Sequence, residues 1–199
     1  MILPVGNTTS QTLDADWKLS KNKKGIAIYT RKTKKSNLKM FKVITEFDES
    51  IEHIVEVLQD VDNYNKWSEN LKYSRLLEKI DTNTIIIYSV LDMPWPFDNR
   101  DVVNKSTTYW SASKDTAIIT IRCLQDYLPE KKGIIRIPHA DGSWKLYKID
   151  DQHFKVEYTF MADPGGSIPG WVVNIFIVDG PYKTVNNLKD YLKVKYKDN

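Results

Sequence analysis

Short stretches in which hydrophobic and polar residues alternate make up most of this chain of 199 residues. That period of two is typical of β-strands with one buried face. It predicts strands at 25–32, 38–48, 73–80, 84–91, 101–110, 116–125, 133–139, 143–149 and 154–161. Turn-forming residues separate them, and Asp141-Gly142 is a strong hairpin signal. Successive short strands with tight turns predict a largely antiparallel sheet of about nine strands.

Residues 49–60 change to the spacing of an amphipathic helix. Its hydrophobic positions, Ile51, Ile54, Val55 and Leu58, line one face, and Ser50 is the expected N-cap. The aromatic residues that follow at 63–67 are predicted to form a loop, and a short element at 14–19 is expected to be anchored by Trp17.

The stretch from Asp163 predicts a second, longer helix. Residues 164–166 have turn chemistry, Ser167 stands at the N-cap position, and Pro169 fits the first helical turn. The helix is expected to run to about Tyr191. Its first half is hydrophobic over a wider arc than an ordinary surface helix needs, which indicates that it covers a large hydrophobic surface.

Gly180-Pro181 interrupts this helical pattern, and a proline in mid-pattern predicts a kink. Asp179 precedes the kink and falls within the hydrophobic arc. Either the kink turns Asp179 outward, or its carboxylate is a polar group that faces a ligand.

These elements predict an α+β fold. A long, twisted antiparallel sheet must curl and bury its concave face, and only two helices are available to cover it. Such a sheet around one long helix can leave a cavity. Without repeats or a linker, residues 1–199 are predicted to be one domain, in which 1–12 form a loose arm.

The net charge is +3, but residues 1–42 carry ten Lys or Arg against two Asp. This basic segment is either a solvated face or a surface that favours anionic membranes. Nucleic acid is disfavoured as a partner because no recognition module accompanies the charge.

Several features bear on location. No hydrophobic run approaches the ~18–20 residues that cross a bilayer, and the start lacks the pattern of a signal peptide. The single Cys123 rules out an internal disulfide framework and fits a reducing compartment. If the chain is complete, these features predict a cytoplasmic protein, and nothing in the pattern demands a dimer.

No motif for catalysis, metal binding or a cofactor was found. His53, His139 and His153 are scattered, the glycines fit no phosphate loop, and the carboxylates form no acid–base pattern. We therefore expect no catalytic residues, metal ligands or cofactor. This absence of motifs favours a binding function over an enzymatic one.

The segment at 93–103 stands out, since two prolines make its first part a rigid loop carrying Met93, Trp95 and Phe97. The loop either packs inward as core cover or forms an exposed patch, as a cavity rim or a membrane probe. Arg100 and Asp101 follow it, and as adjacent strand residues they cannot both face one cavity.

Four segments of the chain together resemble the START family of lipid-transfer domains. They are Trp17 with Gly25–Arg31, Val61–Trp67, the proline-rich loop ending in Asn99-Arg-Asp-Val-Val103, and Asp163–Asn174 leading into the last helix. The last two are specific in order and spacing, and the four span nearly the whole chain from about Asp16.

The resemblance implies a helix-grip fold, with a curved antiparallel sheet around the C-terminal helix and a tunnel for one hydrophobic molecule. It implies a gate formed by the 92–99 loop and the start of the last helix. At matching positions, the candidates for lining the gate or tunnel are Trp95, Phe97, Trp171, Val172, Ile175 and Phe176. Arg100 and Asp101 match the family's Arg-Asp pair, for which a structural ion-pair role is expected.

The chain departs from sterol-carrying relatives, which place a buried carboxylate and an arginine on the strands flanking that loop. Residues 84–90 contain no acid, and the expected arginine position falls near Ser106. This favours a more hydrophobic tunnel, or one in which Tyr88, Ser89 or Ser106 supplies hydroxyl contacts.

Three functional hypotheses follow. The first is non-catalytic binding of a hydrophobic, lipid-like molecule, extending to its transfer between membranes through transient contact with a membrane surface. The second is a cyclase or aromatase for a polyketide-like substrate, with Tyr88, Asp179, Arg100 or His139 as acid or base. The third is a partner-binding module whose cavity is incidental.

Overall fold

The structure, a computed structural model, describes residues 16–33, 39–150, 153–166 and 168–197. The strands are β1 (Lys18–Lys23), β2 (Ile26–Lys32), β3 (Lys39–Phe47), β4 (Leu71–Lys79), β5 (Thr84–Leu91), β6 (Asn99–Trp110), β7 (Thr116–Cys123), β8 (Ile134–Arg136), β9 (His139–Lys148) and β10 (Phe154–Asp163). The helices are α1 (Ile51–Gln59), the 3₁₀-helix η1 (Val61–Lys66), α2 (Gly170–Asn174), the π-helical turn η2 (Ile175–Asp179) and α3 (Gly180–Lys195).

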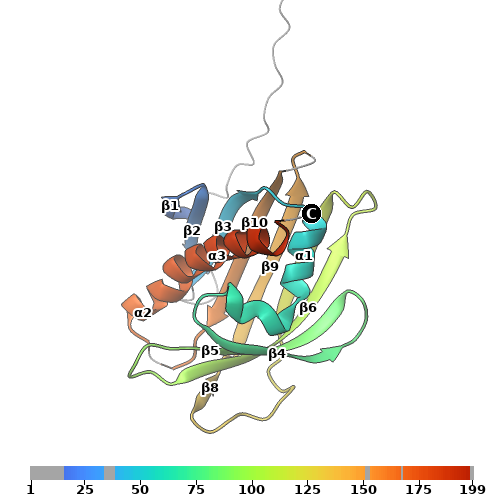
Figure 1. The fold of residues 1–199 in the computed structure, drawn as a ribbon. Coiled ribbons are helices and arrows are strands. Elements are labelled where there is room, and N and C mark those ends of the chain that lie inside the picture. The colour runs from blue at the N-terminus through green and yellow to red at the C-terminus, as the bar shows by residue number, and fades with distance from the viewer. Residues whose placement is uncertain (1–15, 34–38, 151–152, 167, 198–199) are drawn as a thin grey trace, which may run out of the picture.

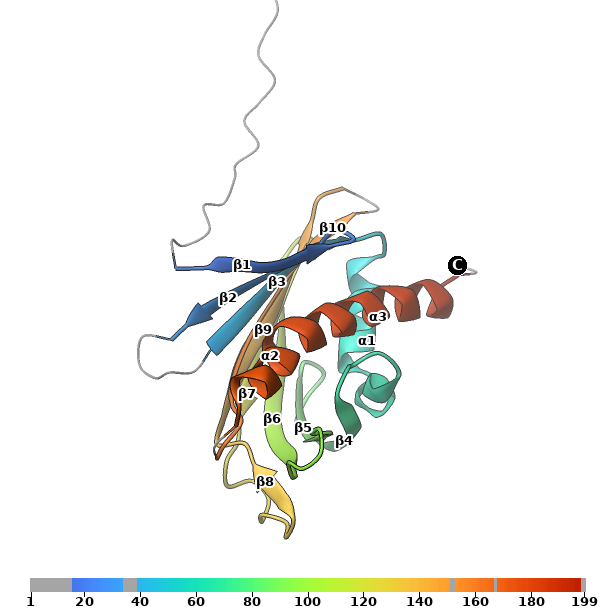
Figure 2. The ribbon, with the colours of Figure 1, turned by 90° about the vertical axis from the view of Figure 1, so that its left-hand side faces the viewer.

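The ten strands form one sheet in the order β1-β2-β3-β10-β9-β7-β6-β5-β4, and β8 pairs with β6 at one side. Every pairing is antiparallel except that of β8, which runs parallel to β6. The sheet curls around the C-terminal helix, which crosses its concave face with α1 beside it (Figures 1 and 2). The predicted curved antiparallel sheet around one long helix is therefore confirmed.

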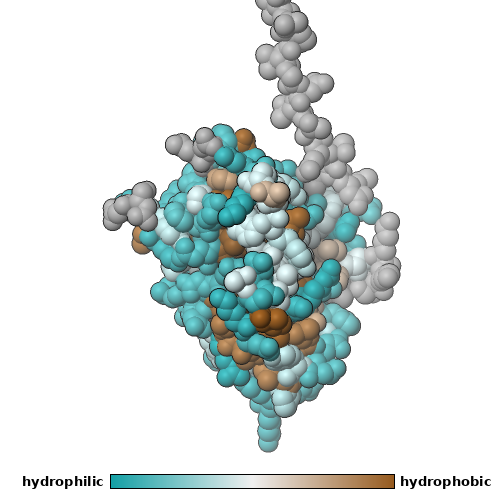
Figure 3. Space-filling model, turned by 90° about the vertical axis from the view of Figure 1, so that its right-hand side faces the viewer, coloured by the Kyte–Doolittle hydropathy of each residue, from teal (hydrophilic) through white to brown (hydrophobic). Residues whose placement is uncertain are grey.

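The main hydrophobic core lies where α3 and α1 meet the concave face. Val185, Leu188 and Leu192 of α3 are at most 1% exposed. They belong to one cluster with Ile54 of α1 and with inward residues of β2, β3, β9 and β10. Hydrophilic side chains predominate on the side of the molecule shown in Figure 3, where hydrophobic ones gather mainly in the lower half.

A second, smaller core lies on the opposite face of β5 and β6. Residues of β5 alternate between the two faces, and both faces are buried. Ile86, Tyr88 and Val90 pack with Val103 on the outer side, where Leu124 and Leu128 cover them. Ile85 and Ile87 point inward toward η1. Burial on both faces explains the nearly continuous hydrophobic run of this strand.

The predicted hairpin at Asp141-Gly142 is wrong, because β9 passes straight through both residues. Asp141 pairs with Met161 and Gly142 with Phe160 on β10. A Cβ added to Gly142 would clash with Cδ2 of Phe160 and lie 2.7 Å from the carbonyl oxygen of Thr159. The glycine therefore serves close packing of an aromatic ring across the strand pair rather than a turn.

The break in the C-terminal helix takes the form of a π-helical turn instead of a simple kink. Pro181 has no N–H to donate to the preceding turn, and the backbone N–H of Gly180 bonds the carbonyl of Ile175, five residues earlier. A Cβ on Gly180 would lie 2.8 Å from that oxygen. The helix begins at Gly170 with Pro169 as N-cap, whereas Ser167, the predicted cap, lies outside the described residues.

Two other local predictions need correction. The segment at 63–67 is mostly helical, since η1 covers Val61–Lys66 and Trp67 ends it. Strand β8 is only three residues long. The proposed arm at 1–12 lies outside the described residues.

The close contact at Gly142 generates a stability prediction. Gly142→Ala should lower the free energy of unfolding by about 1–3 kcal/mol, because the added methyl must displace Phe160 or the backbone. Gly170→Ala is the control, since a Cβ at Gly170 meets nothing within 4 Å, and its effect should stay within about 1 kcal/mol. Urea unfolding measures both. Equal stability of the two variants would contradict this packing role.

Candidate functional site

A cavity of about 670 Å³ lies between the concave face of the sheet and the C-terminal helix. Its volume falls within the ~300–1,000 Å³ range of small-molecule sites. Most of its wall is aliphatic or aromatic. These side chains include Phe41, Leu58, Tyr64, Trp67, Ile87, Leu91, Met93, Val102, Ile119, Ile121, Ile137, Trp144, Tyr158, Phe160, Val172, Phe176 and Ile177.

Aromatic rings from three neighbouring strands form one part of this wall. The rings of Trp144 and Tyr158 stack with centroids 3.9 Å apart, and Phe41 meets Tyr158 edge-on at 5.0 Å. Burial raises the pKa of the Tyr158 phenol far above its usual value. The environment around these rings is therefore one of low polarity.

Neutral polar side chains follow the inner face of β5 and β6. Alternation along β6 brings Asn104 and Ser106 to the cavity, and Ser89 reaches it from β5. The Oδ1 atom of Asn104 and the indole Nε1 of Trp67 are buried without a hydrogen-bond partner among the described residues. Among the described lining residues of these two strands, Arg100 near the start of β6 is the one charged side chain.

The charged residues of the lining are Lys39, Glu69, Arg100 and Asp163, and the last three are held by other groups. Glu69 accepts a hydrogen bond from Lys183 at 2.9 Å, and Asp163 accepts one from the backbone N–H of Gly165 at 2.9 Å. Arg100 donates from Nε to the carbonyl of Pro164 at 3.1 Å and from its other nitrogens to the carbonyls of Asp98 and Gly165. Burial lowers the pKa of the Arg100 guanidinium. Arg100 therefore ties β6 to the turn before α2.

The proline-rich loop and the start of α2 meet at the edge of this cavity. The rings of Phe97 and Trp171 are 6.3 Å apart and nearly edge-to-face. Met93 and Val172 line the cavity and are buried, whereas Trp171 is 55% exposed and Trp95 is 90% exposed. Two large aromatic side chains thus face outward beside the cavity.

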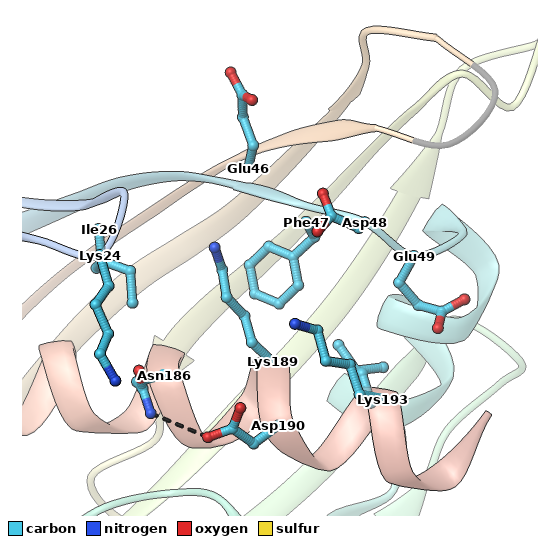
Figure 4. A pocket seen from close by; sticks show the side chains of 11 residues that line it. Lys24, Ile26, Glu46, Phe47, Asp48, Glu49, Asn186, Lys189, Asp190 and Lys193 are labelled. Carbon is cyan, nitrogen blue, oxygen red and sulfur yellow. Dashed lines mark hydrogen bonds between the residues drawn. The ribbon is translucent and has the colours of Figure 1, made fainter. Parts of the chain in front are cut away.

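A smaller groove of about 370 Å³ lies between the start of β2, the end of β3 and α3. Figure 4 shows the lysines and carboxylates that line it, which include Lys24, Lys189, Lys193, Glu46, Asp48, Glu49 and Asp190. Burial lowers the pKa of Lys189, whose ammonium lies 5.2 Å from the centre of the Phe47 ring. Its mixed charges make this groove a poor site for a hydrophobic molecule.

Two features are absent from the described residues. They contain no cluster of three or more His, Cys, Asp or Glu that could hold a metal ion. No helix among them is long and hydrophobic enough to cross a membrane.

The family model for the START domain matches residues 8–193. The chain belongs to the START domain family. An uncharacterized protein of Pseudomonas aeruginosa is 34% identical over 93% of this chain and 91% of its own length. The phosphatidylcholine transfer protein of Bos taurus is 26% identical over 90% of this chain and 84% of its own length.

A solved structure supports the START helix-grip fold. The crystal structure of a STAR-related lipid transfer protein from Xanthomonas axonopodis has a TM-score of 0.81 and 32% identity. The match covers 89% of this chain and 99% of that one.

The residues expected to line a START tunnel divide into two groups. Ser106, Val172 and Phe176 line the cavity, as does Ser89. Trp95, Phe97, Trp171 and Ile175 do not reach its wall, although Phe97 and Trp171 pack on each other beside it. Phe97 and Trp171 therefore belong to the edge of the cavity, and Ile175, in the π-helical turn η2, is outside the lining.

Tyr88 is on the wrong face of the sheet for the predicted ligand contact. It is fully buried on the outer side, where its hydroxyl donates to Oδ2 of Asp101 at 2.9 Å. Its neighbours Ile87 and Ser89 face the cavity, so strand alternation directs Tyr88 away from it. Burial is the main cause that raises the pKa of this phenol well above its usual value, and the Asp101 carboxylate adds to the effect.

Arg100 and Asp101 also point to opposite faces. Asp101 forms an ion pair with Arg136, with Nε–Oδ1 at 2.7 Å and Nη2–Oδ2 at 3.1 Å. The same guanidinium donates to the carbonyls of Gln125, Leu128 and Pro129, so it fastens the segment after β7 to the sheet. The ion-pair role expected for Arg100 needs correction, because its hydrogen-bond acceptors are backbone carbonyls.

Asp179 lies outside the cavity lining. Its Oδ1 pairs with Nζ of Lys21 on β1 at 2.6 Å, and its side chain is 54% exposed. The helix break thus turns it outward, which was the first of the two interpretations.

The sequence analysis missed several lining residues, notably Trp67, Asn104, Trp144 and Tyr158. Asn104 could have been found from Ser106, since residues two apart on a strand share a face. Trp144 and Tyr158 could not, because strand order alone decides which rings meet across β3, β9 and β10.

The buried ion pair provides a second prediction. Arg136→Met should lower the free energy of unfolding by about 3–5 kcal/mol, because it leaves the Asp101 carboxylate buried with only the Tyr88 hydroxyl. Lys183→Met removes an exposed pair, with side chains 58% and 29% exposed, and should change stability by no more than about 1 kcal/mol. A small effect of Arg136→Met in urea unfolding would contradict the structural role of this pair.

Proposed function

We propose that this protein binds one hydrophobic, lipid-like molecule in its cavity without catalysing a reaction, and transfers it between membranes. The observation that carries the proposal is the cavity of about 670 Å³ with mostly aliphatic and aromatic walls under the C-terminal helix. A phosphatidylcholine transfer protein and a STAR-related lipid transfer protein among its relatives support this class of ligand.

The energetics suit a molecule with a long hydrocarbon part. Each buried methylene contributes about 0.8 kcal/mol, so ten of them contribute roughly 8 kcal/mol. Association costs about 4–15 kcal/mol in lost translational and rotational freedom. For a molecule with few methylenes, the free energy of burial would not exceed the cost of association. An acyl chain or a ring system buries enough hydrocarbon to give net binding.

For exchange, we propose that the 92–99 loop and α2 open together as a gate. Both contribute to the wall through Met93 and Val172, and they contact each other through Phe97 and Trp171. The exposed Trp95 and Trp171 lie on this part of the surface, and tryptophan suits the boundary between water and lipid. Opening at a membrane would let the ligand leave without crossing water.

The positions of the acid–base groups favour binding over a cyclase-type reaction. The Tyr88 hydroxyl donates to Asp101, Asp179 pairs with Lys21, and His139 is exposed. Arg100 reaches the cavity, but it donates to backbone carbonyls. General acid–base catalysis needs a group within hydrogen-bond reach of the substrate.

Uptake from vesicles tests the proposed function. The protein is incubated with vesicles of mixed phospholipids, fatty acids and sterols, separated from them and analysed by native mass spectrometry. We expect one lipid per protein, and Phe176→Ala should weaken its binding by roughly tenfold or more, because a ring is lost from the wall. A protein that takes up none of these lipids would contradict the proposal.

The gate hypothesis makes a separate kinetic prediction. Trp95→Ala should slow transfer between vesicles several-fold and leave the equilibrium affinity unchanged, because Trp95 is 90% exposed and does not line the cavity. Tyr109→Ala, which removes another exposed aromatic side chain, is the control and should change neither quantity. Unaltered transfer by the Trp95 variant would count against membrane contact through this loop.

A further inference from the structure

Two buried polar atoms beside the cavity lack a partner. Trp67 is 5% exposed, and its Nε1 has no hydrogen-bond partner within the described residues; the same holds for Oδ1 of Asn104. Both side chains line the cavity. A buried donor or acceptor without a partner is costly, so native folds leave very few of them.

The rest of this region satisfies its buried polar groups, which makes the two exceptions informative. Gln59 donates to the hydroxyl of Thr108 at 3.0 Å, and Thr108 lies on the same inner face of β6 as Asn104. Ser74 donates to the carbonyl of Val61 at 2.6 Å, and the hydroxyl of Tyr64 donates to the carbonyl of Leu58. The unpartnered atoms thus belong to residues that a ligand can reach.

Contacts link Trp67 and Asn104 to the same part of the cavity. Asn104 pairs across the strands with Ile87, and Ile87 belongs to the hydrophobic cluster against which Tyr64 packs. The Tyr64 ring in turn meets Trp67 edge-on at 5.0 Å. Asn104 is four residues beyond Arg100 on β6, which is about 13 Å along an extended strand.

The chemistry of these groups limits what can satisfy them. An indole N–H can only donate, so it requires an acceptor atom. The Oδ1 atom of Asn104 requires a donor, and the hydroxyls of Ser89 and Ser106 on the same inner stretch can do either. The charged lining residue on this face of β6, Arg100, is four residues from Asn104, and its guanidinium donates to backbone carbonyls. An uncharged group with both an oxygen acceptor and a hydrogen donor meets these needs.

Building on the proposed function, we infer that the ligand carries an uncharged hydroxyl or amide group that hydrogen-bonds with Trp67 Nε1 and Asn104 Oδ1. The hydrocarbon part of this ligand then contacts the aromatic and aliphatic wall. The natural ligand class is a neutral hydroxyl- or amide-bearing lipid, rather than one whose head group is only ionic.

A pair of probes with matched chains tests this inference. 1-Hexadecanol has a donor and an acceptor, whereas its methyl ether has only an acceptor. Each is delivered from cyclodextrin, and its affinity is measured by native mass spectrometry. The wild-type protein should prefer the alcohol by roughly tenfold, because the ether leaves Asn104 unpaired.

Asn104→Leu should reduce this preference to about twofold or less. Trp67→Phe removes a donor that both probes accept from, so it should weaken both probes, and more than Trp144→Phe does, while the preference for the alcohol remains. Trp144→Phe is the matched control, since it also shrinks an indole in the wall, but its N–H is not among the unpartnered buried atoms. It should weaken binding of the alcohol and the ether equally and retain the preference. Asn104→Leu should also leave the ligand-free protein as stable as wild type in urea, whereas a structural amide would lose stability on removal.

The outcomes separate this inference from the proposed function. If the protein binds neither probe and no vesicle lipid, the proposed function itself fails. If it binds lipids but does not discriminate alcohol from ether, or if the preference survives in Asn104→Leu, the inference is overturned while the carrier function stands. Uptake of phosphatidylcholine with rejection of the alcohol would overturn it in the same way.

Discussion

One geometric constraint underlies the structure: one long helix, with the short α1 beside it, must cover the concave face of a ten-stranded sheet. The sheet twists and curls, so its inner face is longer and deeper than one helix can fill. Along α3 the fit is close, and Val185, Leu188 and Leu192 are almost fully buried. Toward α2 the helix stands over the wide part of the curve, and the cavity lies there. The binding site is thus a consequence of incomplete coverage.

The distribution of charge follows from the same constraint. A charge on the concave face would need a buried partner, and the desolvation of a buried ion pair offsets much of its Coulombic attraction. The adjacent residues Arg100 and Asp101 of β6 face opposite sides of the sheet, so their charges are not buried together. Asp101 pairs with Arg136 on the outer side, while Arg100 turns to the carbonyls before α2. Further along β6, the side chains that face the cavity at Asn104 and Ser106 are neutral.

Much of this could be predicted from the sequence, because strand alternation and helix periodicity act locally. The strands, the long C-terminal helix and the opposite directions of Arg100 and Asp101 all follow from such patterns. Gly142 was misread because a turn and a close aromatic contact use glycine for different reasons, and only the partner strand distinguishes them. Tyr88 was assigned to the cavity because a strand buried on both faces hides which residues point inward. That Trp67 and Asn104 line the same cavity depends on the tertiary fold and has no local signal.

The central claim is that the cavity holds one hydrophobic molecule. Native mass spectrometry of the protein purified from its own cells tests this most directly, with extraction and identification of whatever is released. The account predicts a complex with one apolar molecule per protein, which extraction into organic solvent removes. A protein that carries nothing when purified, and that stays empty after mixing with lipid vesicles, would contradict it.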